Sequence, residues 1–152
     1  MPGGTVRHVA RTVVLDSAGA VLLLRYDDQS VSYWVPPGGA LRAGESHAVA
    51  AQRELEEETG LRADIGPPLW IRRFVMPYER RLVDQEERYF VVRLSDFRPP
   101  VANQTPDEAI VEGRWWALDE LRRSDELFFP DGFVDLVAPV MLGVIPKTPL
   151  EI

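Results

Sequence analysis

The first part of the chain shows short apolar runs separated by turn residues, a pattern that favours β-strands. Residues 6–15 form the first run, residues 16–19 (Asp-Ser-Ala-Gly) form a turn, and residues 20–25 form the second run. Four consecutive apolar residues in the second run indicate burial on both faces of a sheet. We therefore expect an N-terminal hairpin, followed by a polar loop over residues 26–32.

The hydrophobic period changes to that of a helix after the Pro-Pro-Gly-Gly stretch at residues 36–39. We predict a helix from about Ser46 to Thr59, with Gly60 well suited to the position that follows the last turn. The apolar positions form one stripe on it: Ala48, Ala51 and Leu55. Three glutamates at i, i+3 and i+4 share an arc of about 100° beside that stripe: Glu54, Glu57 and Glu58.

The rest of the chain is interpreted as strands followed by helices. We expect strands at residues 61–65, 69–76, 81–94 and 111–117, a helical turn near 105–108, and helices at 118–123 and 133–142. The last ten residues, 143–152, either drape over the surface or are disordered. This order predicts an α/β (α+β) fold in which a mixed sheet lies between helices.

Composition narrows the class of protein. The 152 residues suit a single domain spanning residues 1–152, with 45% hydrophobic and 27% charged residues. No apolar run approaches the roughly 20 residues that cross a bilayer, and no signal peptide is apparent. Without cysteine, thiolate chemistry and disulfides are excluded, so the cytoplasm is the expected compartment. A net charge of −7 argues against DNA or an anionic membrane as partner.

The three helix glutamates point to a metal. Like charges at i, i+4 oppose helix formation by roughly 0.2–0.5 kcal/mol per pair, and a bound cation would offset that cost. Ligand sets made only of oxygen suit Mg²⁺ or Mn²⁺ better than zinc. The alternative is a solvated acidic face with ion pairs such as Arg53 to Glu57.

A fixed spacing sets this helix apart from an ordinary acidic helix. Gly39 is followed by five residues and Glu45, then by seven residues and Arg53-Glu54. Leu55, any residue, Glu57-Glu58, any residue, Gly60 and Leu61 complete the pattern. This stretch resembles the Nudix box, the signature of the Nudix hydrolases, and departs from it at no fixed position.

The resemblance implies a loop–helix–loop against a mixed sheet and an enzyme that depends on divalent cations. Such an enzyme hydrolyses the diphosphate linkage of a nucleoside diphosphate joined to another moiety. Glu54, Glu57, Glu58 and the Gly39 carbonyl would be the metal ligands. Glu45 would brace the helix by pairing with Arg53, and Gly60 would close it.

Two other functions stay open for the same box. One is a nucleotide-binding sensor or regulatory domain that keeps the fold and lacks turnover. The other is an isomerase of the kind seen in isopentenyl diphosphate isomerases, which rely on a cysteine that this chain lacks.

A further acidic residue after the box is expected as a catalytic base or metal ligand. The candidates are Glu87 and Glu108, with Glu112 behind them. Glu108 also fits a capping box with Thr105, and Glu87 also fits a solvent-facing strand position. One of the box glutamates is an equally valid proton acceptor.

Outside the box, the sequence suggests a nucleotide-type small molecule without selecting it. Trp34 is a candidate for stacking on a base, and Arg72 and Arg88 are candidates for phosphate contacts. The other interpretation of these arginines is the wet face of a hairpin. Trp115 and Trp116 should point to opposite faces of a strand, and one of them would serve a homodimer interface if the chain follows many relatives. His8 and His47 have no spacing that suggests ligands.

Overall fold

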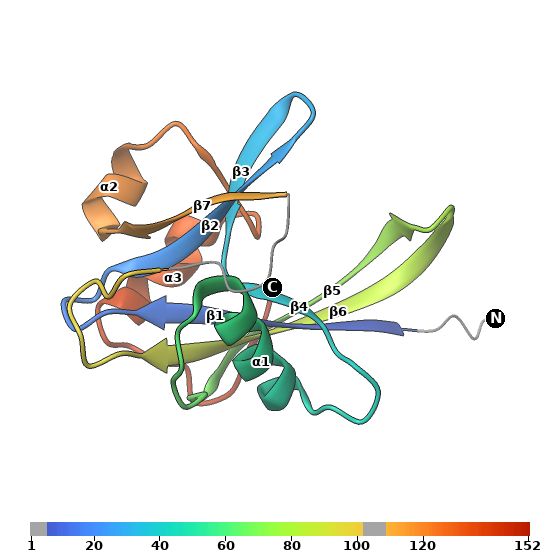
Figure 1. Cartoon of the computed structure of the whole chain (residues 1–152), viewed down its shortest axis with the longest axis horizontal. Helices are drawn as coiled ribbons and strands as arrows, with labels where there is room; N and C mark the ends of the chain where they lie inside the picture. Colours follow the sequence, from blue (N-terminus) through green and yellow to red (C-terminus); the bar gives the residue numbers. More distant parts are fainter. Residues whose placement is uncertain (1–5, 102–108) are drawn as a thin grey trace.

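The protein is described by a computed structural model that covers residues 6–101 and 109–152. The strands are β1 (Val6–Leu15), β2 (Val21–Asp28), β3 (Val31–Val35), β4 (Gly38–Ala40), β5 (Pro68–Tyr78), β6 (Arg81–Arg93), β7 (Ile110–Trp116), β8 (Leu127–Phe128) and β9 (Leu150–Glu151). The helices are α1 (His47–Thr59), α2 (Leu118–Arg123) and α3 (Phe133–Met141). They form a curled mixed sheet with helices on its faces, so the predicted fold class is confirmed (Figure 1).

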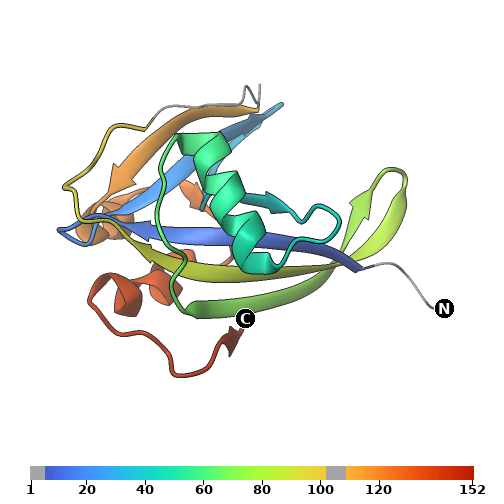
Figure 2. The same ribbon diagram turned by 60° about the horizontal axis from the view of Figure 1, so that its bottom comes forward.

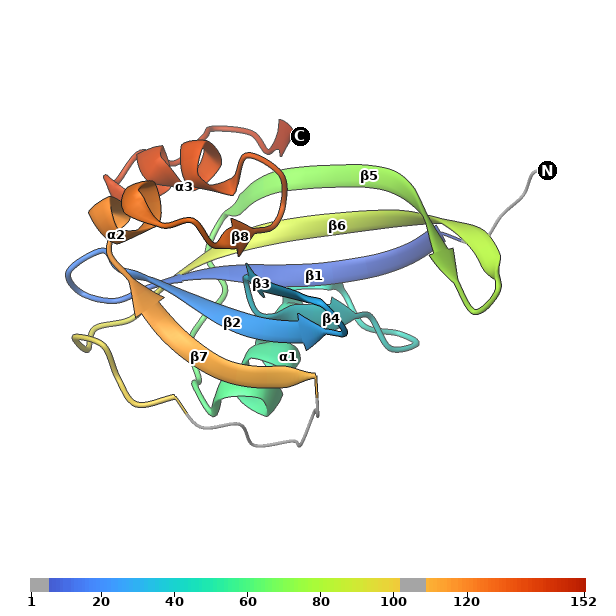
Figure 3. The same cartoon turned by 90° about the horizontal axis from the view of Figure 1, so that it is seen from above.

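The sheet has two wings that meet where β1 pairs with β2: one contains β2 and the strands beyond it, and the other contains β1 and the strands beyond it. Its order is β8-β3-β2-β1-β6-β5-β9, with β4 paired to β1 and β7 paired to β2. The Leu15–Val21 pair joins β1 to β2, whereas β1 runs parallel to β6 over its whole length. The β2 wing and the β1 wing therefore diverge from that junction (Figure 3). β4 pairs with β1 in antiparallel orientation through residues 38–40.

The helices take opposite faces of the sheet. α1 covers one face, while α2 and α3 lie at the other (Figure 2). The larger core is on the side of α2 and α3 and contains three of the four tryptophans: Trp34, Trp70 and Trp116. Smaller clusters under α1 are built around Leu55 and around Ala10 with Ala50 and Ala51. Ala48, predicted for the apolar stripe, is exposed, and Ala50 takes its place.

Local chemistry sets both ends of α1. The Ser46 hydroxyl accepts a hydrogen bond from the Val49 N–H at 3.2 Å, so Ser46 is the N-cap. Gly60 has a φ of 76°, and its N–H donates to the Glu56 carbonyl at 2.8 Å. This left-handed conformation favours glycine and ends the helix. The predicted helix is confirmed to within one residue.

Two predicted segments differ from the structure. Residues 26–32 are not a loop, because β2 continues to Asp28 and β3 begins at Val31. Residues 61–65 form no strand. Leu61 and Ile65 instead pack over the core beneath α1, and the chain rejoins the sheet at Gly66, whose N–H donates to the Val91 carbonyl.

The chain end lies along the far edge of the sheet. β9 pairs in parallel with β5, and Arg73 forms an ion pair with Glu151 at 2.7 Å. Trp115 and Trp116 point to opposite faces as expected, with Trp116 in the larger core and Trp115 on the α1 side. Among the described helices, none has the length and apolar character to cross a membrane.

Candidate functional site

The glycine strand β4 touches the carboxylates of α1. A Cβ atom placed on Gly39 would lie 2.6 Å from Oε1 of Glu54, closer than any side chain tolerates. Glycine at this position therefore allows the β4 backbone to contact the Glu54 carboxylate directly. A larger residue at position 39 would displace the Glu54 carboxylate.

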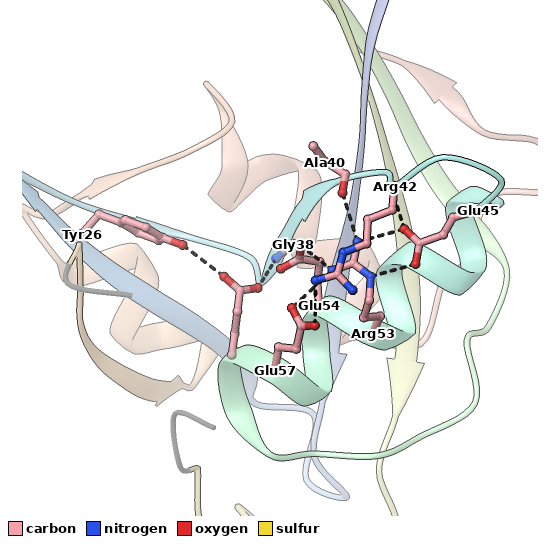
Figure 4. A network of polar contacts seen from close by, with 9 residues as sticks. Tyr26, Gly38, Ala40, Arg42, Glu45, Arg53, Glu54 and Glu57 are labelled. Atoms are coloured by element: carbon pink, nitrogen blue, oxygen red, sulfur yellow. Dashed lines mark hydrogen bonds and ion pairs between the residues drawn. The ribbon is translucent and has the colours of Figure 1, made fainter. Parts of the chain in front are cut away.

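One guanidinium ties the box together (Figure 4). Arg53 donates to both carboxylate oxygens of Glu45, at 2.7 and 2.9 Å. It also donates to Glu54 at 2.9 Å, to Glu57 at 3.2 Å and to the Ala40 carbonyl at 3.1 Å. Arg53 thus links the loop before α1, the acidic side of α1 and β4, and it offsets part of the repulsion among the carboxylates.

Glu45 is held firmly in its ionised form. The Arg53 hydrogen bonds, with help from the Arg42 N–H, lower the pKa of Glu45 to about 2. Arg53 in turn has its pKa raised by the same hydrogen bonds. This pair is ionised over the whole physiological pH range, as suits a structural brace.

Glu58 is the most buried carboxylate of the three, with an exposed fraction of 8%. One of its oxygens accepts from the Gly38 N–H at 2.7 Å, and the other accepts from the Tyr26 hydroxyl at 3.1 Å. Burial, together with the neighbouring Glu54 charge, raises the pKa of Glu58 to about 8. The nearby Arg11 guanidinium favours ionised Glu58, but it does not outweigh the effect of burial.

In residue type these carboxylates suit a divalent cation, although Glu54, Glu57 and Glu58 are not gathered into a cluster of ligand atoms within 4.8 Å of one another in the described part of the chain. All the donor atoms that face the site are oxygen, the preference of Mg²⁺ and Mn²⁺. The raised pKa of Glu58 marks a carboxylate that would ionise if a cation were supplied. Glu57 is the more open member, with its side chain 30% exposed and its carboxylate in contact with Arg42 and Arg53.

A pocket of about 620 Å³ opens next to the carboxylates. Tyr26 joins the two, since its hydroxyl donates to Glu58 and its side chain lines the pocket. Aromatic side chains form one wall: Tyr26, Tyr33 and Phe129. Arginines at the opposite wall add positive charge: Arg11 and Arg72.

Glu87 lies between those two arginines. It is 4% exposed and forms ion pairs with Arg11 and Arg72, each at 3.3 Å. The Tyr89 hydroxyl also donates to it at 2.9 Å. Burial opposes ionisation, but Arg11, the Tyr89 hydrogen bond and Arg72 together lower the pKa of Glu87. The expectation of a solvent-facing Glu87 is wrong, and the carboxylate orients the pocket arginines.

Strand alternation separates the two predicted phosphate-binding arginines. Arg72 lies across from Glu87 in the β5–β6 pair and lines the pocket. Arg88 is the next residue along β6, so it points to the α1 face, where it donates to Glu86 at 2.8 Å. The structure therefore does not bring Arg88 to the pocket.

Two further predictions for site residues also meet a different environment. Trp34 is 2% exposed and packs edge-on against Trp116 at 5.1 Å, so it offers no face to a base. Glu112 on β7 pairs with Arg25 at 2.8 Å, outside the pocket lining. Glu108 lies outside the described residues.

Local sequence patterns indicate little of the pocket. Arg11 is recognisable as the charged residue in the stretch from Val9 to Leu15, which is apolar apart from Arg11 and Thr12. Tyr26 falls in the segment predicted as a polar loop, residues 26–32. Phe129 reaches the pocket from more than ninety residues further along the chain, which no local pattern reveals.

Comparison with known proteins agrees with this geometry. The sequence model of the NUDIX domain matches residues 6–136. The RNA pyrophosphohydrolase of Erythrobacter litoralis is 31% identical over 131 residues, which cover 77% of this chain and 79% of the relative. The match to the family model therefore includes the box, the β4 glycines and both pocket arginines.

Solved structures show the same fold. The mMutator MutT protein from Bacillus halodurans is 26% identical, with a TM-score of 0.63 over 95% of this chain and 86% of that chain. A NUDIX hydrolase from Nitrosomonas europaea is 20% identical, with a TM-score of 0.66 over 95% and 93% of the two chains. Taken with the Gly39–Leu61 box and its acidic helix, these matches show that the chain belongs to the Nudix hydrolase family.

Proposed function

We propose that this enzyme hydrolyses the diphosphate linkage of a 5′-polyphosphorylated nucleotide by attack of water at phosphorus. Mg²⁺, with Mn²⁺ as a substitute, is held by Glu54, Glu57 and Glu58 together with the Gly39 carbonyl. The observation that supports this most is Tyr26, which connects the buried carboxylate Glu58 to an aromatic pocket containing two arginines.

The cation and the protein side chains would have different roles in hydrolysis. When bound, the divalent cation supplies positive charge that neutralises the diphosphate and makes the attacking water more acidic. Arg53 and Glu45 hold the carboxylates in position, and Gly39 lets β4 approach Glu54 closely. Among the carboxylates we assign proton acceptance to Glu57, the more exposed one.

The pocket suits the nucleotide end of the substrate. The guanidinium groups of Arg11 and Arg72 lie 3.3 Å from Glu87, which fixes their positions and balances one of the two positive charges. Asp28 also lines the pocket, and the two arginines are the charged donors available to a phosphate. Tyr33 and Phe129 meet edge to face at 5.3 Å on the aromatic side, where a base gains stacking contact. We assign base recognition to these rings in place of Trp34.

The 5′ end of RNA is the substrate we place first. Relatives named RNA pyrophosphohydrolase support this choice. The net charge of −7 disfavours a long RNA footprint, so recognition is confined to the terminal nucleotide and its phosphates. A cytoplasmic location is consistent with that substrate.

A product assay tests the proposal. The protein is incubated with Mg²⁺ and a 5′-triphosphorylated RNA oligonucleotide, a nucleoside triphosphate panel and a dinucleoside polyphosphate, and the released phosphates are identified. We expect cleavage of the RNA 5′ end that stops when the cation is chelated. Tight binding without cleavage of any compound would contradict hydrolysis and favour the sensor alternative. Cleavage of free nucleotides alone would contradict the RNA assignment.

A further inference from the structure

Both histidines of the chain converge on one buried carboxylate. The sequence contains two histidines, His8 and His47, and no cysteine. In the structure, Nδ1 of His8 lies 3.7 Å from Oε1 of Glu86, and Nε2 of His47 lies 3.9 Å from the same oxygen. The three ligand atoms all lie within 4.8 Å of one another. Residues without any ligand spacing in the sequence are therefore brought together by the fold.

Three separate elements bring these side chains together. His8 on β1 and Glu86 on β6 are direct partners in the parallel β1–β6 register, on the face that α1 covers. His47 is the first residue of α1, and its ring meets the His8 ring edge to face with centroids 5.3 Å apart. The cluster therefore lies at the N-terminal end of α1, whereas Glu58 is one residue from its C-terminal end.

The two ring nitrogens that face Glu86 are shielded from solvent and lack hydrogen-bond partners within residues 6–101 and 109–152. A shielded polar atom without a partner costs free energy comparable to a lost hydrogen bond, so such atoms call for an explanation. Neutral imidazole nitrogens and a carboxylate oxygen that face one another are a set of ligands that a cation can bind.

The spacing is close to that of a metal centre. Zinc bonds of about 2.0–2.2 Å in a tetrahedral arrangement put neighbouring ligand atoms roughly 3.3–3.5 Å apart. The observed 3.7 and 3.9 Å separations need only small side-chain rotations to reach that range. Although Nδ1 is shielded, the His8 side chain as a whole is 42% exposed, so the cluster lies close to the protein surface.

Outer contacts hold Glu86 in place. Arg88 donates to Oε1 at 2.8 Å and Arg73 donates to Oε2 at 3.1 Å. Arg73 also pairs with Glu151, so the nearby charge is partly balanced. Each carboxylate oxygen has two lone pairs, so Oε1 can accept from Arg88 and still bind a cation. Such hydrogen bonds to a ligand are typical around metal centres.

We propose that His8, His47 and Glu86 form a second cation site, separate from the carboxylates of α1, which takes a transition-metal dication of the zinc type. Imidazole with one carboxylate suits Zn²⁺, Co²⁺ or Ni²⁺, whereas Mg²⁺ prefers oxygen ligands. The bound ion would tie the first residue of α1 to β1 and β6, and so steady the helix that carries the box. This inference does not depend on the proposed substrate.

Imidazole NMR tests the site directly, because the chain has only these two histidines. The full chain, labelled with ¹⁵N-histidine, is titrated with Zn²⁺ in the presence of millimolar Mg²⁺. We expect both imidazoles to shift and saturate at one equivalent of zinc, with a rise in Tm of a few degrees. Glu86→Gln and His8→Gln should each weaken zinc binding by at least about tenfold.

Control variants separate this site from the box. Glu57→Gln should keep the imidazole shifts, since it alters only the α1 carboxylates. Glu56→Gln, on an exposed helix position paired with Arg62, should also keep them. Imidazole signals that stay unshifted by equimolar zinc would overturn the proposal. Zinc affinity that is unchanged in both Glu86→Gln and His8→Gln would overturn it as well.

Discussion

At the scale of single residues, Glu58 combines burial with a nearby like charge. It is 8% exposed, and Glu54 adds to the burial effect that raises its pKa to about 8. The Arg11 charge and the hydrogen bonds from Gly38 and Tyr26 act in the opposite direction without restoring the ordinary pKa. In the metal-free protein, ionisation of the Glu58 carboxyl group is therefore unfavourable, and a bound cation would favour it.

The stability of the metal-free protein should depend on pH through Glu58. Its native pKa of about 8 lies above the ordinary 4.5, so the native state binds more protons than the unfolded state between these values. The free energy of unfolding should therefore fall as pH rises from 5 to 8, by up to about 1.4 kcal/mol per pH unit. Glu58→Gln should remove this fall, as measured by urea unfolding with chelator at several pH values.

The pH dependence of the stability difference between Glu58→Gln and the wild type tests this prediction. The stability of Glu58→Gln minus that of the wild type should grow with pH and level off above pH 8, whereas Glu56→Gln should track the wild type. Millimolar Mg²⁺ should narrow the gap by favouring ionised Glu58. A gap that is constant from pH 5 to 8 would argue against the buried, proton-retaining Glu58.

At the scale of elements, α1 is the part most fully specified by nearby residues. Ser46 caps its start, Gly60 ends it, and the Arg53 network spans its acidic side. These are contacts within about fifteen residues, so a sequence pattern captures them. The helix carries the box carboxylates in its C-terminal half and His47 at its beginning.

The cap contribution can be measured on its own. Ser46→Ala removes the hydroxyl that accepts from the Val49 N–H, so it should lower the free energy of unfolding by about 1 kcal/mol. Ser46→Asp keeps an acceptor at the N-cap and should stay close to the wild type. Urea unfolding of the three proteins makes the comparison. Equal losses in both variants would show that the cap does not stabilise α1.

Sequence and structure diverge where contacts are long-range. The strands β2 and β3 extend through much of residues 26–35 because they pair with each other across the hairpin. The polar residues in this segment favour a loop when the sequence is considered alone. The sequence does not reveal that Trp34 is buried, because its contact partner Trp116 is 82 residues away in the chain. The faces of Arg72 and Arg88 depend on the β5–β6 register, which sequence alone does not fix. The box was readable because its spacing is local.

At the scale of the whole molecule, the two wings of the sheet create the pocket. β2 and β3 bring Tyr26 and Tyr33 to one wall, while β1 and β5 bring Arg11 and Arg72 to the other. α1 ends beside both, with Glu58 reaching Tyr26. Under the proposed function, nucleotide recognition and diphosphate hydrolysis would therefore take place next to each other.

A matched pair of arginines tests this arrangement. Arg72→Gln removes a charged donor from the pocket and should lower kcat/KM about 10- to 100-fold, mainly through KM. Arg88→Gln removes an arginine that points to the α1 face and should change kcat/KM less than about twofold. Steady-state kinetics on the best substrate compares them. Similar losses for both would contradict the assignment of the pocket to one face of the sheet.

The central claim is that diphosphate hydrolysis takes place at the α1 carboxylates. The most direct measurement is Mg²⁺-dependent kcat/KM on the 5′-triphosphorylated RNA or the best cleaved nucleotide for Glu57→Gln and Glu58→Gln, beside Glu56→Gln. We predict a loss of about 10²-fold or more for the first two variants, with folding intact, and near wild-type turnover for the third. Hydrolysis that continues unchanged in Glu57→Gln and Glu58→Gln would contradict the central claim.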